Sequence, residues 1–369
     1  MITYKKQIRT DLRYLLATIA TLTLIGIIFI YSSSSIFALE KHGAAYYFVK
    51  KQIIGLLLGI AALVVVRLTP FALIKKSTPL LFVGAFCLTA MTYVPGLSTR
   101  IHGSSRWLNL FGFSFQPSEL LKFALIMYVA YLLEKKEKIN KNFMAKYMPI
   151  FLVLGLSCAV LLKQPDFGLT VTLFTTVLTM IFVMQFNIKY LLIMLAGIIP
   201  AVSALILFQP YRLKRVLTFL DPWADPQGAG FQIIQSLIAV GSGGFWGLGI
   251  TQSKQKFFYL PMQHTDFIFS IIAEETGFVG ALFLISLYAL LLYFGIKIAW
   301  QLNDTFSTFT MLGFATLISL QATINLAVAT GLAPTKGIGL PFVSYGNTSL
   351  VCYLAMVGLI MNLVHAQRS

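Results

Sequence analysis

Charged residues are scarce in this sequence, and acidic ones most of all. Of its 369 residues, 11% are charged and only 12 are Asp or Glu, whereas soluble domains carry about 25% charged residues. This scarcity excludes an ordinary water-soluble domain. The hydrophobic content of 58% excludes a disordered chain. A mean hydropathy of +0.83 is typical of a polytopic membrane protein.

Cysteine and histidine are also few, and neither forms a ligand pattern. Each of the three cysteines lies inside an apolar run, which argues against a disulfide framework or a metal cluster. The four histidines are far apart and show no metal-ligand spacing. These residues are Cys87, Cys158, Cys352, His42, His102, His264 and His365.

Long apolar runs are abundant, and we expect them to be membrane-spanning helices. A bilayer core needs about 20 apolar residues per helix. The runs lack the alternation of a β-barrel, so helices must satisfy the backbone polar groups in lipid. The first run follows a basic segment and has no clear small-residue cleavage site, so we read it as a retained span. Ten runs qualify, at 14–33, 52–69, 78–95, 118–133, 147–162, 168–186, 190–208, 267–296, 307–330 and 342–364.

Basic residues predict the orientation. Ten spans place both termini on one side, and the dense clusters at Lys5–Arg13 and Lys135–Lys146 favour the cytoplasmic side for both. The 28 Lys and Arg residues exceed the 12 acids by 16, which in a soluble protein would suggest nucleic acid. Here we expect no nucleic acid. About half of the basic residues fall on the outer side, where topology alone does not explain them.

The outer segments are unlike passive connectors. The longest, about 209–266, separates the seventh and eighth runs and is long enough to be functional. We expect short amphipathic helices within it, lying on the outer leaflet, and one domain over 1–369. It ends in Asp266 at the mouth of an apolar run, where an unpaired acid is costly unless it is used. Glu274 and Glu275 lie two turns deeper, and for them structural pairing with a lysine is the leading interpretation.

Five ordered motifs carry a resemblance over essentially the whole chain. The sequence resembles the FtsW/RodA family of polytopic cell-wall proteins, and Pro334-Thr-Lys-Gly337 is more like the division branch than the elongation branch. Met262-Gln263, Thr276 and Asn347-Thr348 depart from common family residues. The motifs are Arg106-Trp-Leu-Asn with Phe115-Gln-Pro-Ser-Glu119, Gln164-Pro-Asp-Phe-Gly168, Gly230-Phe-Gln-Ile-Ile-Gln-Ser236, His264-Thr-Asp-Phe-Ile-Phe269 with Ala273-Glu-Glu-Thr-Gly277, and Pro341-Phe-Val-Ser-Tyr-Gly346.

The resemblance implies a peptidoglycan glycosyltransferase that polymerises lipid II on the outer face of the cytoplasmic membrane during septal wall synthesis at the division site. It implies Asp266 as the catalytic residue. It also implies a class B penicillin-binding protein and other division membrane proteins as partners. Pyrophosphate is already a good leaving group, so one general base suffices, and Asp266 is our candidate to deprotonate the acceptor 4-hydroxyl. We expect inversion, from an α-linked pyrophosphate to a β-linked strand.

Cations from separate outer segments are candidates to hold the pyrophosphate, because Lys and Arg stabilise such charge as it develops. Glu119 is expected to orient Lys122, three residues along one helix face. A divalent cation, Mg²⁺ or Mn²⁺, is left open, with no ligand spacing to demonstrate it. The candidate substrate-binding residues are Arg106, Lys122, Lys336, Arg212, Arg215, Glu119, His264 and Ser344.

Two alternatives stay open at this stage. A transporter of lipid II would need ionisable groups at mid-membrane depth, and Glu274 and Glu275 keep that interpretation alive. A scaffold that activates a penicillin-binding protein without catalysis would tolerate loss of Asp266. The strongest polar clusters fall at the outer ends of the spans, which favours chemistry at that face.

Overall fold

The computed structural model describes residues 2–94, 98–101, 104–110, 113–137, 143–183, 207–257 and 260–367, together with 196, 200 and 203. The seventh predicted run, 190–208, lies almost wholly outside this part. In the described part, six helices are long and apolar enough to cross a membrane. They are α1 (Ile2–His42), α2 (Tyr47–Leu68), α3 (Phe71–Met91), α10 (Ile268–Ala299), α11 (Thr305–Ala329) and α12 (Asn347–Ala366).

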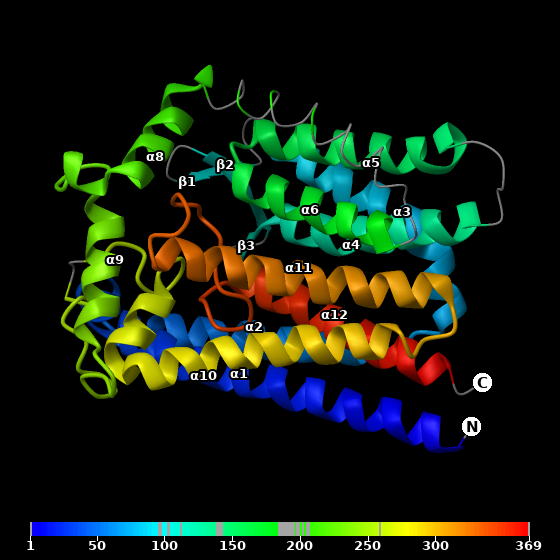
Figure 1. The fold of residues 1–369 in the computed structure, drawn as a ribbon, viewed down its shortest axis with the longest axis horizontal. Coiled ribbons are helices and arrows are strands. Elements are labelled where there is room, and N and C mark those ends of the chain that lie inside the picture. The colour runs from blue at the N-terminus through cyan, green and yellow to red at the C-terminus, as the bar shows by residue number, and fades with distance from the viewer. Residues whose placement is uncertain are drawn as a thin grey trace.

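Three further helices coincide with the fourth to sixth predicted runs. They are α4 (Pro117–Glu137), α5 (Phe143–Lys163) and α6 (Phe167–Val183). The predicted all-α polytopic membrane architecture is confirmed. Both termini lie at one end of the bundle, as ten spans require (Figure 1). The first predicted run, 14–33, ended too early, because α1 continues through Ser32–Ser34 to His42.

The helices pack closely where small residues allow their backbones to approach. α12 lies along α2, and a Cβ at Gly358 would meet the Leu63 carbonyl oxygen at 2.4 Å. A Cβ at Gly59 of α2 would likewise meet Leu354 of α12 at 2.4 Å. Membrane helices associate through such close packing, since lipid gives them no hydrophobic drive to associate. This contact fixes the helix that follows the last outer loop.

The end of the bundle opposite the termini carries a small antiparallel sheet that the sequence analysis did not predict (Figure 1). Its strands are β1 (Ser98–Ile101), β2 (Ser104–Leu110) and β3 (Phe113–Phe115), in the order β1-β2-β3. Thr99 pairs with Trp107 and Arg100 with Ser105, so Arg106 is the extra residue of a β-bulge. A bulge bends its strand and redirects a side chain.

The long connection contains helices, as predicted. α8 (Pro210–Leu220) has Pro at its first position, where the missing N–H costs no hydrogen bond. A 3₁₀ turn (Pro222–Ala224) and α9 (Phe231–Ser242) follow. α8 and α9 lie at the same end as the sheet (Figure 1). The position of these helices on the outer leaflet stays a prediction.

α10 is interrupted at Gly277, whose φ of 67° and ψ of −165° lie outside helical geometry. The backbone N–H groups of Phe278 and Val279 donate to the carbonyls of Gly244 and Phe245 instead of completing the helix. In exchange, the carbonyls of Glu274 and Glu275 accept from Leu248 and Gly249, both at 3.0 Å. The break therefore joins the first two turns of α10 to the loop after α9 without leaving backbone groups unpaired.

Candidate functional site

Asp266 lies directly before α10, and the surrounding chain fixes its backbone. Asn325 of α11 donates from Nδ2 to the carbonyls of Asp266 and Ile338, both at 2.7 Å. The Ser344 hydroxyl donates to the Thr265 carbonyl at 2.5 Å and accepts from the Leu340 N–H at 2.7 Å. Ser344, a predicted substrate-binding residue, thus holds the segment before Asp266. Its own role toward substrate stays a prediction.

Apolar packing fixes the other side of Asp266. The next residue, Phe267, is buried in a small hydrophobic cluster. The cluster is separate from the main core and joins the long connection, α10 and α11. Its buried members are Leu260, Phe267, Ile271 and Val328. Asp266 is closely surrounded by protein but keeps some solvent exposure, so a small group such as a hydroxyl can reach its side chain.

Arg106 reaches this region from the bulge in β2. Its guanidinium donates from Nε to the Gln164 carbonyl at 3.1 Å and from Nη2 to the Pro165 carbonyl at 2.6 Å. Its Nη1 lies 3.5 Å from Oδ2 of buried Asp166. The short turn between α5 and α6 therefore orients Arg106, since the planar guanidinium has a fixed fork of donors.

Gly337, in the connection between α11 and α12, lies beside both groups. A Cβ built on Gly337 would lie 3.7 Å from Oδ2 of Asp266 and 3.9 Å from Nη1 of Arg106. A large side chain at this position would therefore enter the space between the carboxylate and the guanidinium. Arg215 of α8 is anchored to the same connection, with Nη1 donating to the Thr335 carbonyl at 3.0 Å.

Burial raises the pKa of Asp266 to about 7, although the charges of Arg106 and Arg215 oppose the increase and Asp166 adds to it. A general base works best when its pKa lies near the operating pH. At neutral pH a substantial fraction of Asp266 is ionised, and its proton affinity is much higher than that of an ordinary aspartate. Asp266 can therefore accept a proton from a hydroxyl.

Glu119 and Lys122 lie in the first turns of α4, and their predicted pairing is confirmed. Lys122 Nζ is 2.7 Å from Glu119 Oε2 and 3.5 Å from the Tyr353 hydroxyl. Tyr353 in turn donates to Gln321 at 2.6 Å. Lys122 is only 1% exposed. The positive charges that act on Asp266 are those of Arg106 and Arg215. The positive charge of Lys122 acts instead on Asp166.

Two other predicted cations flank one aromatic ring. Lys336 Nζ lies 5.6 Å and Arg212 Cζ 5.7 Å from the ring centre of Phe167, the first residue of α6. Burial lowers the pKa of Lys336. The face of an aromatic ring attracts a cation through its quadrupole. Together with Arg106 and Arg215, these cations supply positive charge from three segments, namely β2, α8 and the connection between α11 and α12.

His264 is placed in an aromatic cluster. Its ring centre lies 5.8 Å from Phe37, 4.4 Å from Phe48 and 5.7 Å from Tyr345. Burial lowers the pKa of His264 to about 4, so the ring is neutral at pH 7. The backbone N–H of Tyr345 donates to the His264 carbonyl at 3.0 Å. This placement ties the outer ends of α1 and α2 to the segment that bears Asp266. Substrate binding by His264 stays a prediction.

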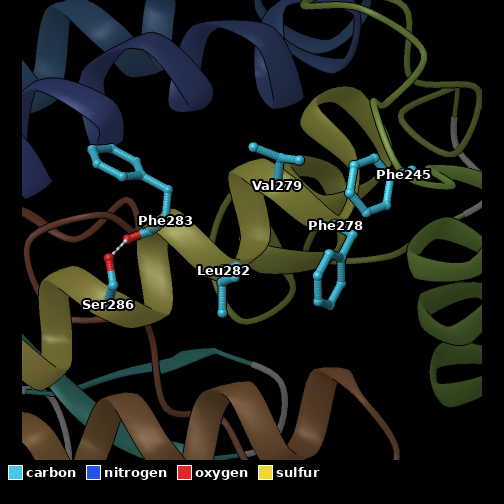
Figure 2. A pocket seen from close by; sticks show the side chains of 6 residues that line it. All are labelled: Phe245, Phe278, Val279, Leu282, Phe283 and Ser286. Atoms are coloured by element: carbon cyan, nitrogen blue, oxygen red, sulfur yellow. Dashed lines mark hydrogen bonds between the residues drawn. The ribbon is translucent and has the colours of Figure 1, made fainter.

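An apolar hollow lies elsewhere, on the second part of α10 (Figure 2). Its single polar lining group, the Ser286 hydroxyl, donates to the carbonyl of Phe283 at 2.7 Å. The hollow has no titratable side chain, so it offers no acid–base chemistry. Its lining residues are Phe245, Phe278, Val279, Leu282, Phe283 and Ser286.

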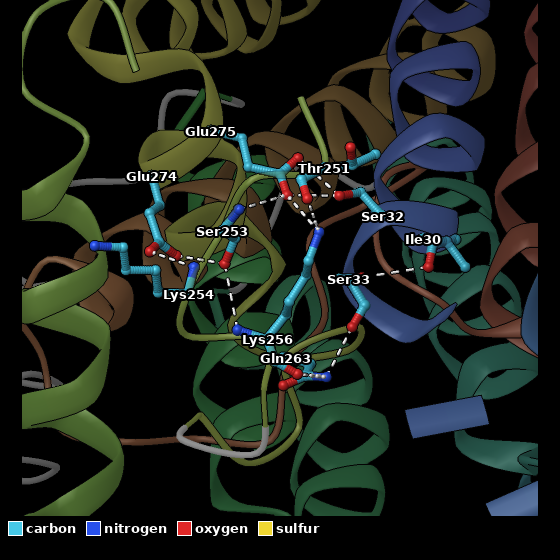
Figure 3. A network of polar contacts seen from close by, with 10 residues as sticks. All are labelled: Ile30, Ser32, Ser33, Thr251, Ser253, Lys254, Lys256, Gln263, Glu274 and Glu275. Atoms are coloured by element: carbon cyan, nitrogen blue, oxygen red, sulfur yellow. Dashed lines mark hydrogen bonds and ion pairs between the residues drawn. The ribbon is translucent and has the colours of Figure 1, made fainter. Parts of the chain in front are cut away.

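Glu274 and Glu275 are fully buried in a network of polar contacts (Figure 3). Lys256 Nζ is 3.3 Å from Glu275 Oε1, so the expected lysine pairing is confirmed for Glu275. Glu274 instead accepts hydrogen bonds from the Ser253 hydroxyl and the Lys254 backbone N–H. Both carboxylates are thus satisfied within the protein. Within the described residues, no three His, Cys, Asp or Glu side chains form a metal-binding group.

Two residues of this site were not predicted from the sequence. Asn325 stands in an ordinary apolar helix, and its position in the sequence gives no sign that it bridges two loops. Asp166 was quoted in a motif but not chosen, although an acid in a three-residue turn between two spans is a usable signal. Both act on the residues that present Asp266 and Arg106.

These features define a polytopic membrane protein with a carboxylate of raised pKa and several cations at the end of its bundle opposite the termini. The chain belongs to the family described as cell cycle protein, whose FtsW, RodA and SpoVE model matches residues 12–369. A relative from Geobacter sp. (strain M18), named probable peptidoglycan glycosyltransferase FtsW, is 44% identical over 92% of this chain and 93% of that protein. Stage V sporulation protein E of Bacillus subtilis (strain 168) is 38% identical over 98% and 99%.

Solved structures agree with this assignment. One, reported as "Structural coordination of polymerization and crosslinking by a peptidoglycan synthase complex", matches with a TM-score of 0.78 and 30% identity. It covers 95% of this chain and 96% of its own. The rod shape determining protein RodA of Thermus thermophilus shares the fold, with a TM-score of 0.72, 24% identity and coverage of 96% and 97%.

Proposed function

We propose that this chain is a peptidoglycan glycosyltransferase that polymerises lipid II on the outer face of the cytoplasmic membrane, at the division site. The relative from Geobacter sp. (strain M18) carries peptidoglycan glycosyltransferase activity in its name. The observation that supports it most directly is Asp266, a partly accessible carboxylate with a pKa of about 7 beside Arg106.

Asp266 is proposed as the general base. It takes the proton of the acceptor sugar's 4-hydroxyl as that oxygen attacks the anomeric carbon of the donor. The new C–O bond forms as the bond from the anomeric carbon to the pyrophosphate oxygen breaks. Attack from the face opposite the leaving group converts an α-linked pyrophosphate into a β-linked glycan. One base is sufficient, because the pyrophosphate leaves as an anion and needs no proton.

The cations are proposed to stabilise the leaving pyrophosphate. Arg106 and Arg215 suit this role, because a guanidinium can bind two phosphate oxygens at once. Lys336 and Arg212, held over Phe167, are proposed to bind the incoming lipid-linked pyrophosphate. Substrate binding by Lys122 and Glu119 stays a proposal, since both side chains are buried and paired with each other, with Tyr353 between Lys122 and α11.

A divalent cation fits this site only in a restricted way. The described residues offer no group of three metal-ligating side chains, whereas Mg²⁺ at phosphates is commonly held by one or two carboxylates plus phosphate oxygens. If Mg²⁺ or Mn²⁺ were bound, we propose that Asp266 or Asp166 would hold it together with pyrophosphate oxygens. It would supply further positive charge there.

We propose a class B penicillin-binding protein as the partner, with other division membrane proteins in the same assembly. The support is the solved synthase complex, whose description joins polymerisation to crosslinking. The apolar hollow on α10 does not by itself identify a partner, since lipid covers exposed apolar surface in a membrane equally well.

The deciding experiment supplies lipid II to the purified protein, with its partner, and measures glycan strands by gel. Wild type should polymerise, and Asp266→Asn should lose about 10²–10⁴-fold in rate, the usual range for a general base. Undiminished polymerisation by Asp266→Asn would refute the assignment. A wild type that moves lipid II across liposomes without polymerising it would favour the transporter. A wild type that does neither but restores partner activity would favour the scaffold.

A further inference from the structure

Three segments meet at the buried carboxylates of α10 (Figure 3). Glu274 and Glu275 lie in the first turns of α10, before its break at Gly277, and each is 1% exposed. The serines of α1 approach from one side and the loop after α9 from the other (Figure 3). This network is eight residues along the chain from Asp266, and the mechanism above does not use it.

Glu275 is the centre of the network. The Ser32 hydroxyl of α1 lies 2.6 and 2.7 Å from its two carboxylate oxygens. Its Oε1 also accepts from the Ser253 backbone N–H and from Lys256 Nζ, both at 3.3 Å. One carboxylate thus receives donors from α1 and from two residues of the loop.

Glu274 and Lys256 complete the attachment of the loop. Glu274 accepts from the Ser253 hydroxyl at 2.5 Å and from the Lys254 N–H at 2.9 Å. Lys256 Nζ also donates to the Thr251 carbonyl at 2.5 Å. The Lys256 ammonium therefore binds one carboxylate and one backbone carbonyl, those of Glu275 and Thr251. The second contact closes the loop 251–256 on itself.

A single side chain continues this attachment toward Asp266. Gln263 Nε2 donates to the Lys256 carbonyl at 3.2 Å and to the Ser33 carbonyl of α1 at 2.7 Å. Gln263 is buried, and it stands three residues before Asp266. The backbone of Lys256 and the backbone of α1 thus hold the residue from which the Asp266 segment begins.

The energetics argue that this network specifies a position more than it adds stability. Burying an ion pair costs several kcal/mol per ion in desolvation, and apolar residues of equal volume often stabilise a fold as well or better. Here the side chains of Glu274, Glu275 and Lys256 are buried together. Such a costly arrangement fits a role in fixing the geometry of the loop.

The network does not act on Asp266 through charge. The groups that set the Asp266 pKa are its own burial, Arg106, Arg215 and Asp166, and none belongs to the network. A connection through the backbone remains, from Lys256 through Gln263 to Thr265. A perturbation here should therefore move the Asp266 carboxylate relative to those groups, and the Asp266 pKa should change with its position.

We propose that Lys256 and Glu275 are positioning residues that set the place of Asp266 relative to the cations of the site. This inference rests on the proposed function, in which Asp266 is the base. Displacing a catalytic group by about 1 Å can cost about 10²-fold in rate. Substrate binding depends on other residues, so the loss should appear in kcat and not in KM.

The test compares Lys256→Met with Lys297→Met in the lipid II polymerisation assay. Lys297 is a matched control, because it pairs with Asp11 at 2.8 Å and so joins the same two helices, α10 and α1, at the opposite end. We expect Lys256→Met to lower kcat by about 10–100-fold. Its KM should stay within about twofold of wild type, and Lys297→Met should keep wild-type kcat. The pH at which activity is half-maximal should shift in Lys256→Met and stay at the wild-type value in Lys297→Met.

Several results would overturn the proposal. They are a wild-type kcat for Lys256→Met, an equal loss in Lys297→Met, or a rise in KM alone. If Lys256→Met fails to reach the membrane, Ser32→Ala decides instead, because it removes one hydroxyl from Glu275 and leaves all charges in place. A lower kcat at constant KM in Ser32→Ala supports the proposal, and a wild-type kcat refutes it.

The same assay separates this proposal from the assignment of Asp266. If Asp266→Asn is inactive and Lys256→Met is fully active, the positioning role fails and the base assignment survives. If Asp266→Asn is fully active, the base assignment fails, and the positioning role fails with it.

Discussion

Two groups of acidic side chains lie close together in the sequence and differ sharply in their surroundings. Glu274 and Glu275 are fully buried and surrounded by hydroxyl, amide and ammonium donors. Asp266 is partly exposed, has its backbone carbonyl fixed by Asn325, and has a Gly337 neighbour that leaves space beside its carboxylate. Protein donors fully occupy the first group, whereas Asp266 remains accessible. Partial exposure therefore distinguishes Asp266 from the two buried glutamates.

The cations show the same contrast. Lys256 is 4% exposed, and its ammonium binds the Glu275 carboxylate and the Thr251 carbonyl. Arg106 keeps partial exposure although it also binds Asp166 and two carbonyls. A guanidinium has five N–H donors, so it can be oriented by some and still offer others to a ligand. An oriented but accessible cation is what phosphate binding requires.

Of the variants that test this comparison, one that lacks Arg106 should lose the most activity. We expect Arg106→Ala to lower kcat by about 10²–10³-fold, the usual loss for one transition-state donor. Arg106→Lys keeps the charge but loses the fork, and we expect it to retain more activity than Arg106→Ala. Polymerisation rates for both variants, with membrane abundance as the control, check this. Equal rates for wild type and Arg106→Ala would show that the leaving group is stabilised elsewhere.

Filling the space beside Asp266 should have the next largest effect. Gly337→Leu places a side chain between the carboxylate and Arg106, and we expect a loss of about 10–100-fold, comparable to the displacement of a reacting group. Gly337→Ala is the control, since its Cβ makes ordinary contacts at 3.7 and 3.9 Å. Steady-state kinetics on lipid II check both. Full activity in Gly337→Leu would mean that substrate does not enter this space.

The pH profile should move when a cation near Asp266 is removed. Because the Asp266 pKa is about 7 and the ionised form is the base, activity should fall as pH decreases through about 7. Arg215 lowers this pKa, so Arg215→Gln should raise the half-activity pH by up to about one unit. Lys297→Met serves as the unshifted control. A profile that moves to lower pH in Arg215→Gln would contradict the predicted sign.

The smallest of these effects should be that of Asp266→Asn on the thermal stability of the protein. The folded Asp266 pKa of about 7 lies above the ordinary value of 3.8, so the unfolded chain ionises first as pH rises. Asp266 therefore destabilises the fold increasingly between pH 4 and 7, fully above pH 7, and not at all below its ordinary pKa. Asp266→Asn should raise the thermal midpoint at pH 8 by about 2–4 °C, the shift that about 1 kcal/mol produces. Thermal scans at pH 8 and pH 5 check this, with a smaller gain expected at pH 5.

Much of the fold was readable from the sequence because membrane helices follow one strong rule. Apolar length alone placed α2, α6 and α11 to within a few residues. The boundaries failed where polar residues continue a helix, as at Ser32–Ser34, or where an apolar run is not helical. Phe342 and Val343 are apolar and buried, but α12 begins only at Asn347.

The site was readable only in part. The motifs supplied Arg106, Asp266 and the pair Glu119 and Lys122, because these residue types are costly at a membrane surface without a partner or a use. The small sheet was not predicted, because its three strands are short. The β-bulge that turns Arg106 toward Asp166 depends on strand register, which no single strand sequence records.

The break in α10 also has a consequence for hydrogen exchange. Leu248 and Gly249 lie in a loop, and loop amides ordinarily exchange quickly with solvent. Their amide protons are instead bonded to the Glu274 and Glu275 carbonyls, so they can be released only when the first turns of α10 separate from the loop. These two amides should therefore exchange at the same slow rate as those of Phe278 and Val279. They would report the opening of the whole Asp266-bearing unit as a single event.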